Sequence, residues 1–229
     1  MIPVLAVPVL NQPSMLAACL ASIDEPVERL IVIDNSGTGA LGDVAAAVRP
    51  DALIVDPPSN LGVAASWNFA IRTTPDAPWW CLVNADVEFA PGDLARLAAW
   101  MVDDRPALGT LVEFGAFGIN RLAFEAVGWF DENFHPIYCE DADYEYRCLQ
   151  AGVPIDALYA AATHVGSVSY RGNANAEANA RTYPANLDYY ERKWGGPLRG
   201  GERFTTPFDQ GGSVRDWTLD LSRLRSQAW

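Results

Sequence analysis

The chain has 229 residues, of which 50% are hydrophobic, and its 16 basic and 29 acidic residues give a formal net charge of −13 at pH 7. This length and apolar content predict one globular domain with an appended segment. The negative charge argues against direct binding to duplex nucleic acid or to an anionic lipid surface, and it suits a site that holds a metal cation.

The cysteines and the N-terminus bear on where the protein works. None of the four cysteines lies in a CxxC pair, so we expect them to be reduced and buried. Residues 1–10 are apolar but contain two prolines and no basic residue, so they predict a strand and no signal peptide. No apolar run approaches the roughly 18 residues that a membrane-spanning helix needs. We therefore expect a cytoplasmic protein.

Apolar runs alternate with helical patterns through the first hundred residues. Each predicted strand is followed by a helix, with strands at 4–10, 29–35, 52–58 and 79–87 and helices from Ser14, at 40–48, at 62–73 and from Pro91. Ser14 is expected to cap the first of these helices. Continuous apolar strands that alternate with helices predict an α/β fold, a mainly parallel sheet of Rossmann-like type with helices on both faces. Trp67, Trp79 and Trp80 are expected in its core.

The pattern becomes irregular after about residue 105. It predicts one or two strands within 107–120, then a helix at 121–127, a helix from about Glu140, a strand within 153–164 and a helix that ends near Trp194. Residues 197–229 are rich in Gly, Arg and Asp and are expected to form a C-terminal extension. Its tryptophans and leucines could bury against a second copy, so a homodimer through this extension is one expectation.

Polar residues follow each of the first four predicted strands. They are Asn11 after the first, Asp34 and Asn35 after the second, Asn60 after the third, and Asn84 and Asp86 after the fourth. Any one of them alone would be explained as a turn residue. Because ligands bind at the carboxyl ends of the strands in open parallel sheets, the whole set predicts a binding site at that edge.

Several kinds of site are excluded by missing motifs. The first strand-to-helix turn has no GxGxxG, and the chain has no GxxxxGK[ST] and no HExxH. Two histidines are too few for a His-rich zinc site. Carboxylates, amides and one histidine instead suit a hard cation, Mg²⁺ or Mn²⁺, which commonly partners phosphate oxygens.

The stretch "YCEDADYEYRCLQAG", residues 138–152, gathers four acidic side chains at the start of a predicted helix. The helix amides and dipole are expected to stabilise the charged forms of Glu140 and Asp141. Asp143 and Arg147 are spaced to pair on the helix surface. From this pattern alone, helix capping explains Glu140 and Asp141 as well as a catalytic role does.

Taken together, the motifs resemble family 2 glycosyltransferases, and within them the rhamnosyltransferase-like branch, over roughly residues 1–195. The segments that carry the resemblance occur in the family's order: "NQPSMLAACLASI", "VIDNSGTG", "SNLGVAASWNFAI", "LVNADVEF", "FGINRLAFEAVGWFDENF", "YCEDADYEYRCLQAG" and "HVGSVSY". The resemblance implies a GT-A fold over residues 1–196, with a nucleotide-sugar-binding half at about 1–104 and an acceptor-binding half at 105–196. It also implies inverting transfer of a sugar from a UDP-, dTDP- or GDP-sugar to a hydroxyl of a glycan, a lipid-linked glycan or a protein.

The resemblance also implies roles for single residues. Asp141 matches the catalytic base and Glu140 would orient the acceptor or the base. Asp86 matches the last residue of the metal-binding DxD-type motif, in which Asn84 replaces the first Asp, and His164 matches a histidine that completes the Mn²⁺ or Mg²⁺ site in some relatives. The implied donor and acceptor residues are Pro8, Asn11, Asp34, Asn35, Asn60, Gly62, Asn68, Asn84 and Ala85 for the donor, and Gly115, Trp129 and Phe130 for the acceptor.

Some alternatives remain open from the sequence. His164 is equally well explained as a structural hydrogen-bonding residue, and Trp129 and Phe130 as packing residues. A nucleotide-sugar-binding protein of this fold without catalytic activity is one alternative function, although it would be free to lose Asp86 or Asp141. A sugar nucleotidylyltransferase is another, but the chain lacks the Gly-rich N-terminal loop with Arg and Lys that this class uses.

Overall fold

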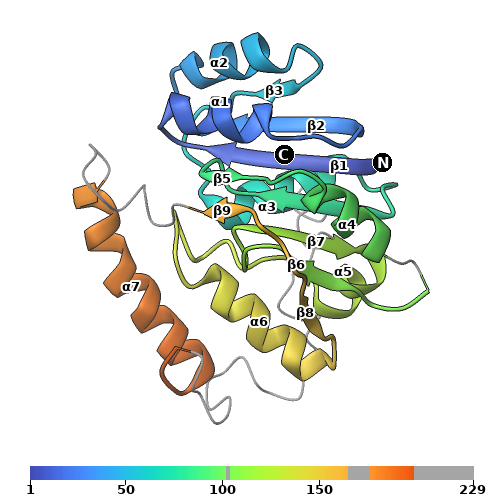
Figure 1. The fold of residues 1–229 in the computed structure, drawn as a ribbon. Coiled ribbons are helices and arrows are strands. Elements are labelled where there is room, and N and C mark those ends of the chain that lie inside the picture. The colour runs from blue at the N-terminus through green and yellow to red at the C-terminus, as the bar shows by residue number, and fades with distance from the viewer. Residues whose placement is uncertain (102–103, 165–175, 199–229) are drawn as a thin grey trace, which may run out of the picture.

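The structure of the chain is a computed structural model that describes residues 1–101, 104–164 and 176–198 (Figure 1). The strands are β1 (Ile2–Val9), β2 (Val27–Asp34), β3 (Leu53–Val55), β4 (Trp79–Val83), β5 (Val87–Glu88), β6 (Leu108–Thr110), β7 (Ala116–Asn120), β8 (Ile155–Ala157) and β9 (Thr163–His164). The helices are α1 (Pro13–Ala21), α2 (Ala40–Val48), α3 (Val63–Thr73), α4 (Asp93–Trp100), α5 (Arg121–Val127), α6 (Glu140–Ala151) and α7 (Ala176–Trp194).

The described strands form a seven-stranded sheet and a separate two-stranded ladder. The order in the large sheet is β3-β2-β1-β4-β7-β6-β8. Strand β7 runs antiparallel to its neighbours β4 and β6, and the other neighbouring pairs are parallel. Strands β5 and β9 pair with each other in the small ladder. The predicted mainly parallel sheet is therefore confirmed.

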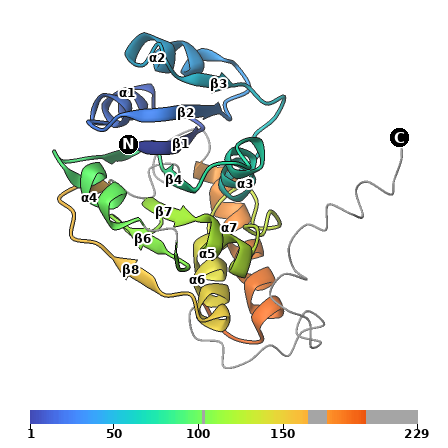
Figure 2. The same ribbon diagram turned by 90° about the vertical axis from the view of Figure 1, so that its right-hand side faces the viewer.

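Helices cover both faces of the sheet, as predicted. Along β1, Val4 and Ala6 pack with helices α3, α5 and α6, whereas the alternate residues Leu5 and Val7 pack with α1, α2 and α4. In Figure 2, α1 and α4 lie to the left of the sheet and α3, α5 and α6 to the right. This period of two follows from the pleat of a strand. Each face therefore has its own apolar core.

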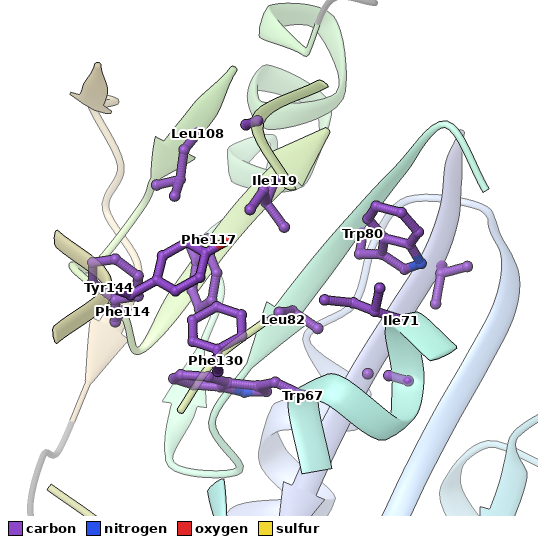
Figure 3. Packing of buried hydrophobic residues seen from close by; sticks show 14 of the residues in the cluster. Trp67, Ile71, Trp80, Leu82, Leu108, Phe114, Phe117, Ile119, Phe130 and Tyr144 are labelled. Carbon is purple, nitrogen blue, oxygen red and sulfur yellow. The ribbon is translucent and has the colours of Figure 1, made fainter. Parts of the chain in front are cut away.

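The three tryptophans expected in the core are buried. Trp67 and Trp80 are 1% and 2% exposed and belong to the core on the α3 side, while Trp79 belongs to the core on the other face. The ring of Trp67 meets those of Phe117 and Phe130 edge to face, with centroids 5.1 and 4.9 Å away (Figure 3).

Two predicted strands are each divided in the structure. The run 79–87 separates into β4 and β5, and the run 153–164 separates into β8 and β9. After β4, the backbone N–H of Asn84 donates to the carbonyl of Gly115, and the chain then leaves the large sheet. Neither run contains a glycine that would mark the break, and the proline of the second run, Pro154, lies before β8. The division therefore depends on tertiary pairing.

The start of α1 differs from the expected cap at Ser14. The helix begins at Pro13, and Gln12 precedes it in the left-handed conformation, with φ 70° and no side-chain capping bond. Proline suits the first helical position because its fixed φ is helical and it has no N–H that needs a partner. The cap position is therefore Gln12, two residues before the predicted Ser14, and Pro13 is the first helical residue.

Helix α7 is fixed to the domain by a buried ionic network. The ammonium of Lys193 lies 2.7 Å from Asp131 Oδ2 and 2.6 Å from Asp143 Oδ1. Trp194 Nε1 donates to Asp143 Oδ1 at 2.8 Å, and the Tyr189 hydroxyl donates to Asp131 Oδ2 at 2.9 Å. The last turns of α7 thus bind both α6 and the segment that precedes it.

The predicted pair of Asp143 and Arg147 forms, but it is buried and not on the helix surface. Their side chains are 0% and 1% exposed, and Arg147 Nε donates to Asp143 Oδ2 at 2.9 Å. Arg147 Nη1 also donates to the carbonyls of Val127 and Trp129. The surface expectation was wrong because α7 covers the carboxylate side of this pair.

Two expectations from the sequence concern membrane-spanning helices and the C-terminal extension. No helix in the described ranges is both long enough and apolar enough to cross a bilayer. The predicted C-terminal extension, with the homodimer expected from it, lies outside the described residues apart from 197 and 198.

We expect Lys193→Met to lower the free energy of unfolding by about 3–5 kcal/mol, because it leaves the carboxylate of Asp131 without a cation and that of Asp143 with Arg147 alone. Arg192→Met is the matched control, since Arg192 is the next residue of α7 and its pair with Asp188 is solvent-exposed. Urea denaturation of the three proteins measures the difference. Equal stability of wild type and Lys193→Met would contradict the assigned role of the network.

The difference in free energy of unfolding between wild type and Lys193→Met should depend on pH. Burial tends to raise the pKa of Asp131, but the attraction of Lys193 and hydrogen bonds from Asn133 and Tyr189 outweigh it and lower this pKa from 3.8 to about 2. A lowered pKa stabilises the fold above pH 3.8, by about 2 kcal/mol here, and this contribution is lost as the pH falls toward 2. The stability gap between wild type and Lys193→Met should therefore narrow across this range in pH-dependent urea denaturation.

Candidate functional site

A pocket of about 440 Å³ lies at the carboxyl ends of β1 and β4. Most of the residues that the sequence predicted for the site line it: Pro8, Asn11, Asn35, Asn60, Gly62, Asn84, Ala85, Asp86, Gly115, Glu140, Asp141 and His164. The sheet edge, the DxD-type turn and the start of α6 thus face one cavity.

Two predicted donor residues lie outside the lining and have partners in the fold. The Asp34 carboxylate is buried and accepts hydrogen bonds from the backbone N–H groups of Ser36, Leu41 and Gly42 at the start of α2. Burial tends to raise the pKa of Asp34, but these bonds outweigh it and lower the pKa. Asn68 donates to Phe130 O and accepts from Phe130 N, so it fixes the 130–132 segment onto α3.

Two predicted acceptor residues also lie outside the lining. Phe130 is 2% exposed and stacks on Tyr144 with ring centroids 3.9 Å apart. The guanidinium of Arg72 lies over the ring of Trp129, 5.0 Å from its centroid. Both aromatic rings therefore have packing partners, which is the alternative that the sequence left open.

Strand pairing between β5 and β9 brings Asp86 and His164, the two candidate cation ligands, together. Val87 pairs with His164, so His164 lies beside the turn that carries Asn84 and Asp86. His164 Nε2 is 3.2 Å from Asp86 Oδ1, and both side chains are partly exposed to the cavity. The hydrogen bond to Asp86 raises the pKa of His164, and burial opposes it. Asp86 and His164, which are 78 positions apart in the sequence, thus form one polar pair because a two-residue ladder brings them together.

Gly115 makes room for this histidine. A Cβ at position 115 would lie 2.8 Å from the His164 ring and 3.0 Å from the Val112 carbonyl. Real Cβ contacts are not that short, so a larger residue would displace the ring from Asp86. Besides the binding role predicted for it, Gly115 therefore has a steric role: its lack of a side chain lets the His164 ring reach Asp86.

The residues present fit a cation that takes part of its coordination from a ligand. Within the described ranges, no group of three or more His, Cys, Asp or Glu side chains is arranged to hold a metal ion. Asp86 and His164 supply two donor side chains, and the Asn84 amide lines the same cavity. Mg²⁺ and similar ions accept such partial sites when substrate phosphates and water complete the shell.

The acid pair at the start of α6 is carried by a segment that is held from two sides. The Pro136 carbonyl accepts from Val63 N at 2.9 Å, at the start of α3. Asn186 Nδ2, from α7, donates to the carbonyls of Ile137 and Tyr138 at 2.8 and 3.1 Å. Tyr138 and the following residue then adopt the left-handed conformation, with φ 78° and 80°, and turn the chain into the helix. The acid pair is therefore fixed by α3 and α7.

Glu140 and Asp141 differ in their electrostatics. Glu140 is 7% exposed, and burial raises its pKa to about 8, with a smaller contribution from the charge of Asp141. The expectation that the helix terminus stabilises the charged form was wrong for Glu140, because desolvation outweighs the backbone hydrogen bonds. Asp141 Oδ1 accepts from the N–H of Ala142 at 2.8 Å. At neutral pH Glu140 is therefore mostly protonated.

Several lining residues were missed by the sequence analysis. They are Val9, Leu10, Gln12, Met15, Val63, Glu113, Phe114, Pro136, Ile137 and Tyr138, together with Trp67, which was expected only in the core. Glu113 adopts a left-handed φ of 48° in the turn before Gly115, and its proximity to that predicted residue was the available signal. Positions 136 and 137 carry no motif of their own, and Tyr138 stands at the edge of the acidic stretch 138–152.

We expect His164 to titrate above the ordinary histidine value of 6.5 in the metal-free protein, and Asp86→Asn to return its pKa toward 6.5. A raised pKa stabilises the fold below pH 6.5, and this contribution is lost as the pH rises through the raised value. NMR titration of the imidazole signals measures both. A His135→Gln variant assigns the two histidines, and an unchanged His164 curve in Asp86→Asn would contradict the pairing.

The comparisons with known proteins agree with this fold. The structure of GalNAc-T7 with UDP, GalNAc and Mn²⁺ superposes with a TM-score of 0.60 at 12% identity, covering 84% of this chain and 50% of that one. The structure of S. aureus TarS 1-349 in complex with UDP gives 0.57 at 12% identity, covering 86% and 72%. At these identities the likeness shows the fold alone, and it confirms the expected GT-A fold.

Sequence comparison shows which protein family this chain belongs to. A Leishmania donovani galactofuranosyl glycosyltransferase is 50% identical over 36 residues, which is 16% of this chain and 8% of the relative. The chain thus spans a small part of this curated relative and half of GalNAc-T7. The family model described as glycosyl transferase family 2 matches residues 4–139. The rhamnosyltransferase-like branch stays a prediction. Because the match covers more than half of the chain, this protein belongs to glycosyl transferase family 2.

Proposed function

We propose that this protein is an inverting glycosyltransferase, which moves a sugar from a nucleoside diphosphate sugar to an acceptor hydroxyl with the help of Mn²⁺ or Mg²⁺. The observation that carries the proposal is one cavity that joins the Asp86–His164 pair to the Glu140–Asp141 pair. We further propose that residues 1–104 bind the donor, that residues 105–196 bind the acceptor, and that the protein works in the cytoplasm.

The charge of the cavity supports the use of a cation. Its lining includes the carboxyl groups of Asp86, Glu113, Glu140 and Asp141, and no lysine or arginine among the described residues. A diphosphate brought into such surroundings is repelled unless a cation lies between it and the carboxylates. A divalent cation held by Asp86 and His164 would supply this charge and stabilise the departing diphosphate. The neighbour with UDP and Mn²⁺ bound is consistent with this proposal.

Asp141 is the group that we assign as the base. An acceptor hydroxyl must lose its proton as it attacks the anomeric carbon from the side opposite the leaving diphosphate. Glu140, with its pKa of about 8, is mostly protonated at neutral pH and cannot accept this proton well. Glu140 can instead donate a hydrogen bond, which would orient the acceptor or Asp141. Inversion needs one base and no protein nucleophile.

The donor site that we propose is smaller than the resemblance implied. It consists of Pro8, Asn11, Asn35, Asn60, Gly62 and the Asn84–Asp86 turn, which line the cavity. We leave out Asp34 and Asn68, whose polar atoms are used within the fold. Trp129 and Phe130 are likewise left out of the acceptor site because they have packing partners.

A thermal-shift panel tests the proposal. UDP, dTDP, GDP and their common sugar conjugates are each added with Mn²⁺, Mg²⁺ or EDTA, and a ligand that binds only the native state raises its stability by RT ln(1 + [L]/Kd). We expect a shift with one nucleotide that EDTA removes. A shift that persists in EDTA would contradict the cation site, and no shift with any nucleotide would contradict the transferase.

Asp141→Asn should lower kcat by about 100- to 10,000-fold and leave the Kd of the nucleotide sugar near its wild-type value, because a base acts on the acceptor and not on the donor. Glu125→Gln, on the exposed side of α5, is the control and should retain activity. Steady-state kinetics and calorimetry measure the two quantities. Loss of donor binding in a folded Asp141→Asn variant would remove this residue from the base role.

Asp86→Ala should weaken binding of the nucleoside diphosphate in the presence of Mn²⁺ or Mg²⁺, with little change in EDTA, because only the cation-bridged part of the affinity depends on this carboxylate. Calorimetric titration with and without the metal measures the difference. If the two proteins bind the nucleotide equally with metal present, Asp86 is not a ligand.

A further inference from the structure

Trp67 combines deep burial with a polar atom that has no partner. Its side chain is 1% exposed, and its Nε1 has no hydrogen-bond acceptor among the described residues. The same residue lines the cavity, near Gly62 and Val63 at the start of its own helix. Its ring is fixed edge to face against Phe117 and Phe130 (Figure 3). The indole is therefore rigidly placed with an unused donor.

Two other buried indoles in the described residues, those of Trp80 and Trp194, have an acceptor within the fold. Trp80 Nε1 donates to the Thr74 hydroxyl at 2.8 Å, and Trp194 Nε1 donates to Asp143. A buried N–H without a partner lowers stability, and native proteins rarely leave one unless something else binds it. Trp67 thus differs from Trp80, although both belong to the same apolar core.

The cavity also contains other unpartnered polar atoms. Asn11 Nδ2 and Glu140 Oε2 are buried and lack hydrogen-bond partners among the described residues, and both residues line the cavity with Trp67. Three residues that line one cavity thus each carry an unpartnered polar atom, which indicates a ligand with several hydrogen-bonding groups. An indole can only donate, so its partner must be an acceptor oxygen. The carboxylates of Asp86, Glu113 and Asp141 in the lining disfavour an anionic oxygen that arrives without a cation.

We propose that Trp67 is a specificity-determining residue of this site, and that its indole N–H donates a hydrogen bond to a neutral oxygen, a hydroxyl or ring oxygen, of the sugar substrate. This inference rests on the proposed function, and it adds which chemistry the site recognises. A site with a buried donor of this kind rejects an analogue that lacks the oxygen, because the donor then stays unpaired. The oxygen belongs either to the transferred sugar or to the acceptor.

Trp67→Phe and Trp80→Phe form a matched pair with opposite expectations. Each removes one buried indole N–H from the same core and keeps an aromatic ring. In Trp80→Phe the Thr74 hydroxyl loses its donor, so the melting temperature should fall while ligand binding stays unchanged. Trp67→Phe removes a donor that has no partner within the described residues, so it should destabilise less than Trp80→Phe and weaken sugar binding about tenfold.

The probes are UDP, dTDP and GDP, together with UDP-glucose, UDP-N-acetylglucosamine, dTDP-rhamnose and GDP-mannose, titrated calorimetrically with Mn²⁺ into wild type and both variants. Weaker binding of the sugar conjugate, with equal binding of the free nucleotide, assigns the oxygen to the transferred sugar. Equal binding of the conjugate, with a raised KM for a p-nitrophenyl glycoside acceptor, assigns it to the acceptor. Both results support the inference.

Other results overturn it. Wild-type affinity and wild-type acceptor KM in Trp67→Phe would mean that no substrate oxygen meets the indole. A loss of melting temperature as large as that of Trp80→Phe would mean that Nε1 has a structural partner, such as a bound water. If wild type binds none of the nucleotides, the proposed function fails first and this inference falls with it. A protein that binds a sugar nucleotide equally with and without the Trp67 indole retains the proposed function and loses only the inference.

Discussion

The carboxylate of Asp143 is the contact on which the arrangement of the site depends. It accepts from Arg147 on its own helix, from Trp194 Nε1 on α7, and from the ammonium of Lys193. Arg147 in turn holds the carbonyls that precede the acid-bearing segment. A fully buried carboxylate is tolerable only when its charge and its hydrogen bonds are matched in this way. The first turn of α6, which carries Glu140 and Asp141, thereby gains a fixed direction.

Charge is distributed unevenly between this network and the cavity beside it. The network contains two cations for two acids, Arg147 and Lys193 with Asp131 and Asp143. The cavity lining contains acids without a lysine or arginine among the described residues. An ionic network whose charges cancel thus lies next to a cavity whose lining carries net negative charge. Such a site attracts cations and disfavours anions that arrive without one, which is why a metal-bridged donor fits the proposal.

Much of the cavity lining was predictable, because the ends of parallel strands can be located from the sequence. Asn11, Asn35, Asn60 and Asn84 each follow a strand, and parallel strands bring such ends to one edge. The α6 pair was predictable from its acidic cluster. The burial of the Asp143–Arg147 pair was not, because its cover comes from Lys193, 46 or more positions later. The same limit applies to the unpaired indole of Trp67. Its spacing on α3 predicts only that the side chain points into the core. Whether its Nε1 has a hydrogen-bond acceptor depends on residues that are near it in space and far from it in the sequence.

The contact between Asn186 and the segment before α6 has a consequence for how this site can change. The amide of Asn186 binds the carbonyls of Ile137 and Tyr138, and Val63 N binds that of Pro136, so the segment is held by its backbone. Every residue has a carbonyl, so these bonds do not depend on the side chain of Ile137, which lines the cavity. The ring of Tyr138, in contrast, also packs against Tyr183 of α7, with centroids 5.5 Å apart. At residue 137 the side chain can therefore be exchanged to suit a different ligand while the backbone bonds keep the acid pair in place. A scaffold of this kind allows substrate range to diverge without rebuilding the chemistry.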